Sequence, residues 1–306
     1  MKTTKFNTKK ENKSISRRTF IERSAISFAG LSTVGSLSFT RNKETETTLR
    51  VIAYNVYGCT GWPKDNMMAK KAVEKGQMAI RFANELALYS PDIINFSESP
   101  DESLVKEIAG HLGMKYIRFK SYGNWPGTLL THLDIIDFEN VPVVEGKRSE
   151  KLFTRHWGKA TIRLKNNEKI IVHSAHLFPT ATPEGRVIRL QEISEICKAV
   201  KTDLRNVDSV LVIGDLNHEP DTPEYQEWIK AGFTDTFAET NTGEGPTIKS
   251  DNPTRRIDYI LAQGPIAKQA VSSRPLFEGA FRLNPSDPAS FALSDHLPQF
   301  TLFKTR

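Results

Sequence analysis

The stretch from Val210 to Asn217 constrains the fold of this chain more than any other. Its first four residues are apolar and mostly β-branched, which is typical of a strand buried inside a sheet. Gly214 ends the apolar run, and Asp215 and Asn217 follow one residue apart. The two side chains point to the same side if the extended geometry persists. The stretch therefore predicts a buried strand that delivers a carboxylate and a carboxamide to a sheet edge.

A carboxylate beside a carboxamide suits chemistry on a metal-bound phosphate. The carboxylate of Asp215 can hold a water molecule or a metal ion, and the amide of Asn217 can donate to a developing oxyanion. Asp and Asn also favour turns, so on this stretch alone a strand followed by an ordinary capped turn is the better interpretation. The rest of the chain has to decide between the two.

The net charge of +6 comes from the first 38 residues. That segment holds eight Lys and Arg residues and two Glu residues, so residues 39–306 are formally neutral. A neutral domain can still hide a local basic cleft. It lacks, however, the overall positive charge that draws a protein to nucleic acid.

Residues 1–38 follow the order of a secretory signal peptide, with a basic start and then a mildly apolar stretch through Leu31. That stretch is too short and too rich in Ser and Gly to cross a bilayer. The adjacent Arg17 and Arg18 predict twin-arginine export, with cleavage near Ser38 and a periplasmic or secreted protein. A disordered cytoplasmic tail is the alternative. We expect residues 39–48 to be a linker and 49–306 to be a single domain.

The two cysteines, Cys59 and Cys197, do not have the spacing of a thiolate metal site. They lie far apart in the sequence, so they either pair in an oxidising compartment or both stay free. We favour two free thiols.

Strands and helices alternate irregularly along residues 49–306. The expected strands are 49–57, 93–98, 115–120, 128–137, 152–164, 169–177, 209–215, 256–261 and 299–303. The expected helices are 66–89, 101–112, 183–200 and one that starts at Thr222. Because hairpins interrupt the alternation, two mixed sheets packed face to face, with helices outside, fit better than a parallel sheet or barrel.

Polar residues recur where these strands end. Each has an ordinary explanation on its own, since a histidine at a strand end is usually a surface or satisfied core residue. A carboxylate inside an apolar strand, as at Asp258, is stranger because a buried charge needs a partner. Together and in this order, the residues indicate a single polar site. The set comprises Asn55, Glu98, His176, Asp215, Asn217, Asp258, Asp295 and His296.

The motifs around these residues resemble those of the endonuclease/exonuclease/phosphatase superfamily, which has the deoxyribonuclease I-like fold. The resemblance runs from Leu49 to the C-terminus and depends most on Gly-Asp215-Leu-Asn217 and Ser294-Asp295-His296. It implies a four-layer α/β sandwich and Mg²⁺-dependent hydrolysis of a phosphoester, with Mn²⁺ or Ca²⁺ as alternative metals. Ser97 stands where the family usually has a Gln before the metal-binding Glu, which affects how Glu98 is positioned.

The resemblance also implies which residues hold the metal. Glu98, with Asn55 and Asp295 nearby, would bind a hard divalent cation through oxygen atoms. The cation would polarise the phosphoryl group and neutralise charge at the leaving oxygen.

The remaining residues would carry the proton transfers and bind the phosphate, again as the resemblance implies. His296, oriented by Asp258, would act as a general base or bind phosphate. Asp215 would position or deprotonate the attacking water. His176 would steady a phosphate oxygen or protonate the leaving group, and Asn217 would donate to the transition state.

Members of this superfamily act on different phosphoesters, so the resemblance does not fix the substrate. The neutral charge of residues 39–306 favours a small-molecule or lipid phosphoester over a nucleic acid, and an extracellular nuclease is the second hypothesis. The small basic clusters at 155–157 and 255–256 suit ion pairs or a phosphate better than a DNA track. Trp62, Trp125 and Trp157 would line the pocket or pack in the core. A non-catalytic binding domain is disfavoured because every acid, His and Asn of the pattern is present.

Overall fold

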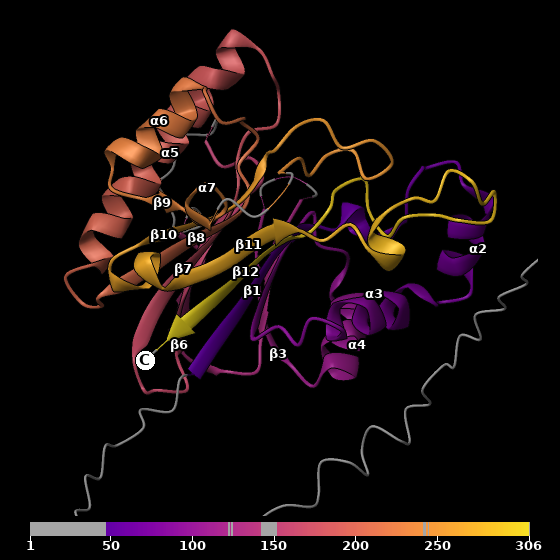
Figure 1. The fold of residues 1–306 in the computed structure, drawn as a ribbon, viewed down its shortest axis with the longest axis horizontal. Coiled ribbons are helices and arrows are strands. Elements are labelled where there is room, and N and C mark those ends of the chain that lie inside the picture. Colours follow the sequence, from indigo (N-terminus) through magenta and orange to yellow (C-terminus); the bar gives the residue numbers. More distant parts are fainter. Residues whose placement is uncertain are drawn as a thin grey trace, which may run out of the picture. The chain divides into compact units, whose positions relative to one another are not determined.

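Two mixed β-sheets of six strands each form the centre of the fold (Figure 1). The computed structural model describes residues 47–121, 123, 125–141, 152–240, 243 and 245–305. The predicted signal peptide, residues 1–38, lies outside the described residues. Within the described residues, no helix is long and apolar enough to span a bilayer.

The first sheet has the strand order β11-β12-β1-β2-β4-β3. β1 and β2 pair in parallel, whereas β12 runs antiparallel to β1 and β4 antiparallel to β2. The strands are β1 (Thr47–Asn55), β2 (Ile93–Ser97), β3 (Lys115–Phe119), β4 (Gly127–Thr131), β11 (Ala270–Pro275) and β12 (Gln299–Thr305).

The second sheet has the order β5-β6-β7-β8-β10-β9. β7 and β8 form its parallel pair, and β10 runs antiparallel to β8. The strands are β5 (Asp134–Glu139), β6 (His156–Arg163), β7 (Lys169–His176), β8 (Ser209–Asp215), β9 (Thr234–Asp235) and β10 (Asp258–Gln263).

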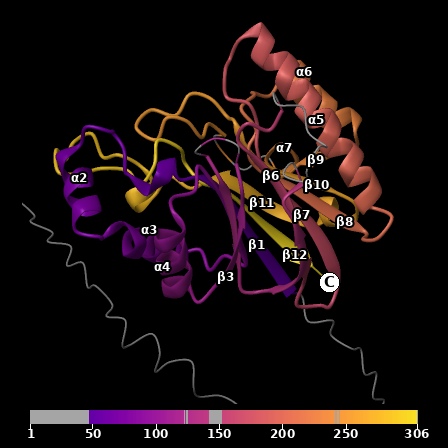
Figure 2. The same cartoon turned by 180° about the vertical axis from the view of Figure 1, so that it is seen from behind.

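Alternating side chains of the central strands fill three apolar layers. Val51 of β1 and Ile213 of β8 lie in the core between the two sheets. Tyr54 of β1 faces the other way, toward α3 and α4, and Val212 of β8 faces α5 and α6. The order is therefore helices, sheet, sheet, helices, which confirms the predicted four-layer α/β sandwich (Figure 2). The helices are α2 (Met67–Glu74), α3 (Met78–Ala87), α4 (Glu102–Leu112), α5 (Pro183–Asp203), α6 (Pro223–Lys230) and α7 (Thr236–Thr240), and the 3-10 turns are η2 (Tyr57–Cys59), η4 (Pro265–Gln269) and η5 (Gly279–Phe281).

The predicted helix starts are confirmed, because each has a side chain that caps the first turn. Asp101 accepts a hydrogen bond from the backbone N–H of Leu104 at 3.0 Å, and Thr182 and Thr222 cap α5 and α6 in the same way. The two cysteines are free, as favoured from the sequence.

Two predicted elements are wrong. The expected helix 66–89 consists of two helices, α2 and α3, because Gly76 between them takes a left-handed conformation with φ +63°. The expected strand 128–137 consists of β4 and β5, which belong to different sheets. The chain turns between them where Thr131 donates to the carbonyl oxygen of Asp92 at 2.7 Å and accepts from the N–H of Leu133 at 3.0 Å.

Gly214 allows β8 to pass close to β7. Its φ is +142°, and a Cβ there would lie 2.0 Å from the carbonyl oxygen of Ala175. We expect Gly214→Ala to lower the free energy of unfolding by about 3 kcal/mol, because the pairing of β7 with β8 must give way. Chemical denaturation measures this loss.

The matched control is Gly110→Ala in α4, where a Cβ meets no atom of the described residues within 4 Å. A helical Gly→Ala change stabilises by up to about 1 kcal/mol. Equal effects of the two substitutions would contradict the steric role assigned to Gly214.

Candidate active site

Six strands bring the predicted polar residues to one edge of the sandwich. The carboxyl ends of parallel strands lie at the same edge, and an antiparallel neighbour begins where its partner ends. β1, β2, β7 and β8 therefore end, and β10 and β12 begin, at this edge. The strand register places Asp215 opposite both His176 and Asp258.

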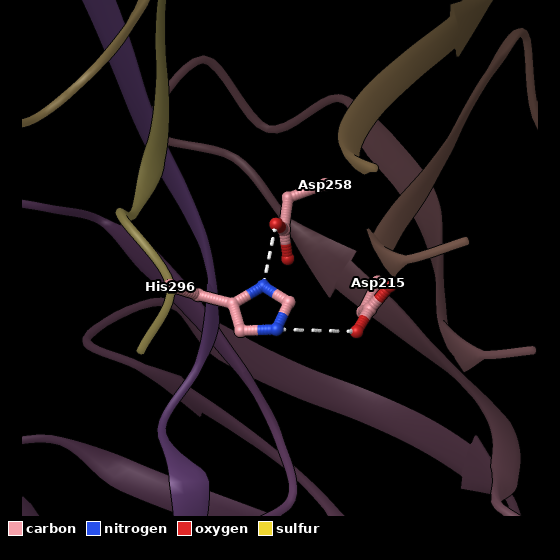
Figure 3. Close-up of side chains that lie close together, drawn as sticks. All are labelled: Asp215, Asp258 and His296. Carbon is pink, nitrogen blue, oxygen red and sulfur yellow. Dashed lines mark hydrogen bonds and ion pairs between the residues drawn. The ribbon is translucent and has the colours of Figure 1, made fainter. Parts of the chain in front are cut away.

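His296 lies between two buried carboxylates (Figure 3). Its Nδ1 is 2.8 Å from Oδ2 of Asp258, and its Nε2 is 3.8 Å from Oδ2 of Asp215. One ligand atom from each of the three residues lies within 4.8 Å of the others. Ser294 holds this loop against β1, since its hydroxyl donates to the carbonyl oxygen of Asn55 at 2.6 Å and accepts from the N–H of His296.

The acidic neighbours decide the charge of His296. Burial alone would lower the pKa of its imidazole, but the charge and hydrogen bond of Asp258, together with the charge of Asp215, raise that pKa to about 10. The ring is thus protonated at neutral pH. In that form it can bind an anionic oxygen, but it cannot accept a proton, which favours the phosphate-binding alternative for this residue.

Asp215 is the most connected residue of the candidate site. Its Oδ2 accepts a hydrogen bond from Nδ2 of Asn55 at 3.0 Å and lies 3.5 Å from Nε2 of His176. Its Oδ1 accepts from the N–H of Asn217 at 3.1 Å. Its own N–H donates to the hydroxyl of Ser97, so Asp215 links the second sheet to the end of β2.

Burial, and after it the charge of Asp258, raises the pKa of Asp215 to about 7. A carboxylate with a pKa near neutrality is well matched to accept a proton from water at neutral pH. Burial also lowers the pKa of His176 well below 6.5, so this imidazole is neutral. A neutral ring can steady a phosphate oxygen by donating a hydrogen bond, and it holds no extra proton to give to a leaving group.

Asn217 does not continue the strand. β8 ends at Asp215, and Asn217 takes a left-handed conformation with φ +52°. Its Nδ2 donates to the carbonyl oxygen of Leu177 at 3.1 Å. Asn217 therefore contacts Asp215 through its backbone N–H in a tight turn, and the two residues do not follow the alternation of an extended strand.

Glu98 and Asp295 provide two further carboxylates that lie half-buried at the same edge. Burial raises the pKa of both, and the charge of Asp295 adds to the effect on Glu98. A bound divalent cation would stabilise the charged forms of these two carboxylates, which burial and mutual repulsion disfavour. The side chain of Asn55 lowers the pKa of Glu98 in part, and its Oδ1 accepts one hydrogen bond, from Tyr57 N–H at 3.1 Å, which leaves a lone pair. These oxygen atoms fit a hard cation such as Mg²⁺.

Arg155 is a further residue of the site whose role the sequence left open. Its guanidinium lies 5.0 Å from the ring centroid of Trp125, and its Nε has no hydrogen-bond partner among the residues that the structure describes. Burial lowers the pKa of Arg155, while the nearby charges of Glu98 and Asp215 raise it. A guanidinium with a free N–H beside an acidic centre is suited to hold a phosphate oxygen.

A row of hydrogen-bonded, buried polar side chains behind His176 was not predicted from the sequence. Nε2 of His156 lies 2.9 Å from the hydroxyl of Ser174, which in turn donates to Oδ1 of Asn95. The available signal was Asn95 itself, a polar residue inside the apolar run of β2. Of the three tryptophans expected in the pocket or the core, Trp157 is buried in the core, Trp125 lies in the wall of a cavity, and Trp62 packs edge-on against Tyr57.

Two stacked mixed sheets with acidic, amide and imidazole groups at one edge define a deoxyribonuclease I-like α/β sandwich. Residues 52–296 match the Endonuclease/Exonuclease/phosphatase family, and the chain belongs to this family. A search of the curated proteins found none that matches the sequence.

Several solved structures share this fold. A mannosyl-6-phosphatase from Bacteroides thetaiotaomicron has a TM-score of 0.63 and 15% identity, over 83% of this chain and 98% of that chain. Truncated TDP2 from Caenorhabditis elegans has a TM-score of 0.61 and 15% identity, over 84% of this chain and 98% of that one. A conserved protein of unknown function from Enterococcus faecalis has a TM-score of 0.63 and 16% identity, over 84% of this chain and 100% of that chain. At these identities the likeness is one of fold.

Proposed function

We propose that this chain is an exported, Mg²⁺-dependent hydrolase that cleaves a small-molecule or lipid phosphoester. The observation that carries the proposal is the buried cluster of Asp215, Asp258 and His296, with ligand atoms within 4.8 Å, beside the half-buried Glu98 and Asp295. Membership of the family and the likeness to a mannosyl-6-phosphatase support a phosphoester as the bond that is cleaved. The proposal of export rests on the sequence of residues 1–38 alone.

In this proposal Glu98, Asp295 and Asn55 hold the cation, which neutralises charge on the phosphoryl group and the leaving oxygen when bound. Asp215 orients the attacking water and takes its proton. His296 binds a phosphoryl oxygen as an imidazolium, and Asp258 fixes the orientation of its ring through the 2.8 Å hydrogen bond.

Hydrogen-bond donors around this centre complete the proposed site. His176 and Arg155 offer N–H groups to the phosphoryl oxygens, and Asn217 donates to the transition state. His176 lies 3.5 Å from Asp215, so it is close to the residue that is proposed to take the proton.

The test is a panel of phosphomonoesters and phosphodiesters assayed with Mg²⁺, Mn²⁺ and Ca²⁺, and with EDTA. We expect hydrolysis with Mg²⁺, complete loss with EDTA, and recovery when excess Mg²⁺ is added back. Full activity in the presence of EDTA would refute the metal-dependent mechanism.

A salt titration separates a small substrate from a nucleic acid. A nuclease that contacts six to ten backbone phosphates loses roughly 10³-fold or more in affinity between 50 and 200 mM salt. Because residues 39–306 are neutral, we expect a much weaker dependence. A steep loss of activity would instead support the extracellular nuclease.

A further inference from the structure

A cavity of about 460 Å³ adjoins the candidate active site on the side of η2 and α2, and we call it the η2–α2 pocket. Most of the surface that lines it is apolar, and two exposed lysines and the exposed Glu74 border it. The residues that matter here are Tyr57 and Thr60 of the η2 turn, Val73 of α2, Trp125 before β4, and Lys64 and Lys70 at the border.

Two walls of the η2–α2 pocket are continuous with the candidate site. The N–H of Tyr57 donates to Oδ1 of Asn55 at 3.1 Å, and the N–H of Gly58 donates to the carbonyl oxygen of Glu98 at 2.9 Å. On the other wall, the guanidinium of Arg155 lies over the ring of Trp125. The pocket therefore begins beside the residues proposed to hold the cation and the phosphate.

The backbone at this junction is strained. Tyr57, Cys59 and Glu98 have φ values of +50°, +57° and +51°, although none of them is a glycine. A bulky residue in the left-handed region persists only where its surroundings fix it, and such residues cluster at functional sites. Here the strain falls on one wall of the pocket and on a proposed metal ligand, which marks the two as parts of one site.

The chemistry of the walls decides what the pocket can hold. Tyr57, Trp125 and Val73 offer apolar contact and ring faces. The polar residues Thr60, Lys64, Lys70 and Glu74 also line the pocket, but polar atoms make up little of the surface that faces it. We propose that the η2–α2 pocket binds a flat apolar group esterified to the phosphate, so that aryl-type phosphoesters are the substrate class. This inference rests on the proposed function.

The test fills the pocket from α2 by Val73→Trp in the full chain with Mg²⁺. Two substrates are compared, 2-naphthyl phosphate and glycerol 3-phosphate, each also as its methyl diester. We expect kcat/KM for the naphthyl esters to fall about tenfold or more, chiefly through a higher KM, while the glycerol esters are unaffected. Comparing the variant with the wild type on each ester removes the difference in leaving-group reactivity between naphthol and glycerol.

Val271→Trp is the matched control. Val271 lies on β11 with 43% of its surface exposed, against 45% for Val73, and we expect its substitution to change neither substrate. Equal losses on naphthyl and glycerol esters in Val73→Trp, or no loss on either, would overturn the inference. A larger loss on the glycerol esters would also overturn it, since the pocket would then hold a polar group.

Calorimetry with 2-naphthylphosphonate and methylphosphonate, which are not hydrolysed, separates this inference from the proposed function. Tighter binding of the naphthyl compound that Val73→Trp abolishes supports the pocket even if no ester is cleaved, in which case the proposed function alone fails. Hydrolysis of the esters with naphthylphosphonate binding indifferent to Val73→Trp refutes the pocket and leaves the proposed function standing.

Discussion

Asp215→Asn is expected to lower the turnover of bis-p-nitrophenyl phosphate by at least about 10³-fold and to leave the fold intact. An amide cannot take a proton from water, so the variant loses the group proposed to activate the nucleophile. The amide oxygen can still accept one of the two hydrogen bonds that Asn55 and Asn217 donate to separate oxygen atoms of Asp215, and the other donor loses its acceptor. Steady-state kinetics measure the loss, and circular dichroism with thermal unfolding tests the fold.

The stability of this variant is informative as well. Burial raises the pKa of Asp215 to about 7, so a charged carboxylate is disfavoured at this position. A neutral amide of the same shape removes that cost but loses one hydrogen bond, so we expect an unfolding temperature at neutral pH close to that of the wild type. An inactive but equally stable protein would separate catalysis from folding.

Asp208→Asn supplies the control for the same chemical change. Asp208 is exposed and lies just before β8, at the end opposite Asp215. We expect wild-type turnover from it. Near-wild-type turnover from Asp215→Asn would refute the role proposed for that residue.

The central strands and the edge at which they meet could be predicted from the sequence because their signals are local. The apolar runs of β8 and β1 appear in consecutive residues, and the polar residues at strand ends follow from strand direction. The four-layer order was implied by the family resemblance, and the structure confirms it.

The boundaries between α2 and α3 and between β4 and β5 could not be predicted from the sequence. Ala72 and Ala79 both continue an apolar helical face, so periodicity alone does not reveal the left-handed Gly76 between them. The turn after β4 depends on the hydrogen bond from Thr131 to the backbone of Asp92, a contact across 39 residues of sequence. Long-range contacts of this kind are absent from any local pattern.

The candidate active site, too, could be predicted from the sequence only in part. The resemblance implied that Asp258 and His296 act as a pair. In the structure, Oδ2 of Asp258 lies 2.8 Å from Nδ1 of His296. The position of Asp215 on the other side of the same imidazole follows from the register of β8 with β10, which the sequence does not state. The contact of Arg155 with Trp125 likewise depends on how the start of β6 meets the loop before β4.

His296→Ala is expected to lower turnover by about 10³-fold or more, because it removes the imidazolium that is proposed to bind the phosphoryl oxygen. The substitution also leaves the buried carboxylate of Asp258 without its imidazole partner, and Oδ1 of Asp258 already has no hydrogen-bond partner in the described part of the chain. Breaking a buried pair in this way costs about 3–5 kcal/mol of stability. Lost activity in this variant alone therefore does not distinguish catalysis from unfolding.

The double variant His296→Ala, Asp258→Asn resolves this, since it replaces the stranded charge by a neutral amide. We expect stability to recover by about 2 kcal/mol or more while activity stays as low as in His296→Ala. Asp258→Asn alone should lose activity as well, and the two losses should not add, because Asp258 is proposed to act only through the ring it orients. Additive losses, measured as a double-mutant cycle in kcat/KM, would show instead that Asp258 contacts the substrate or the metal directly.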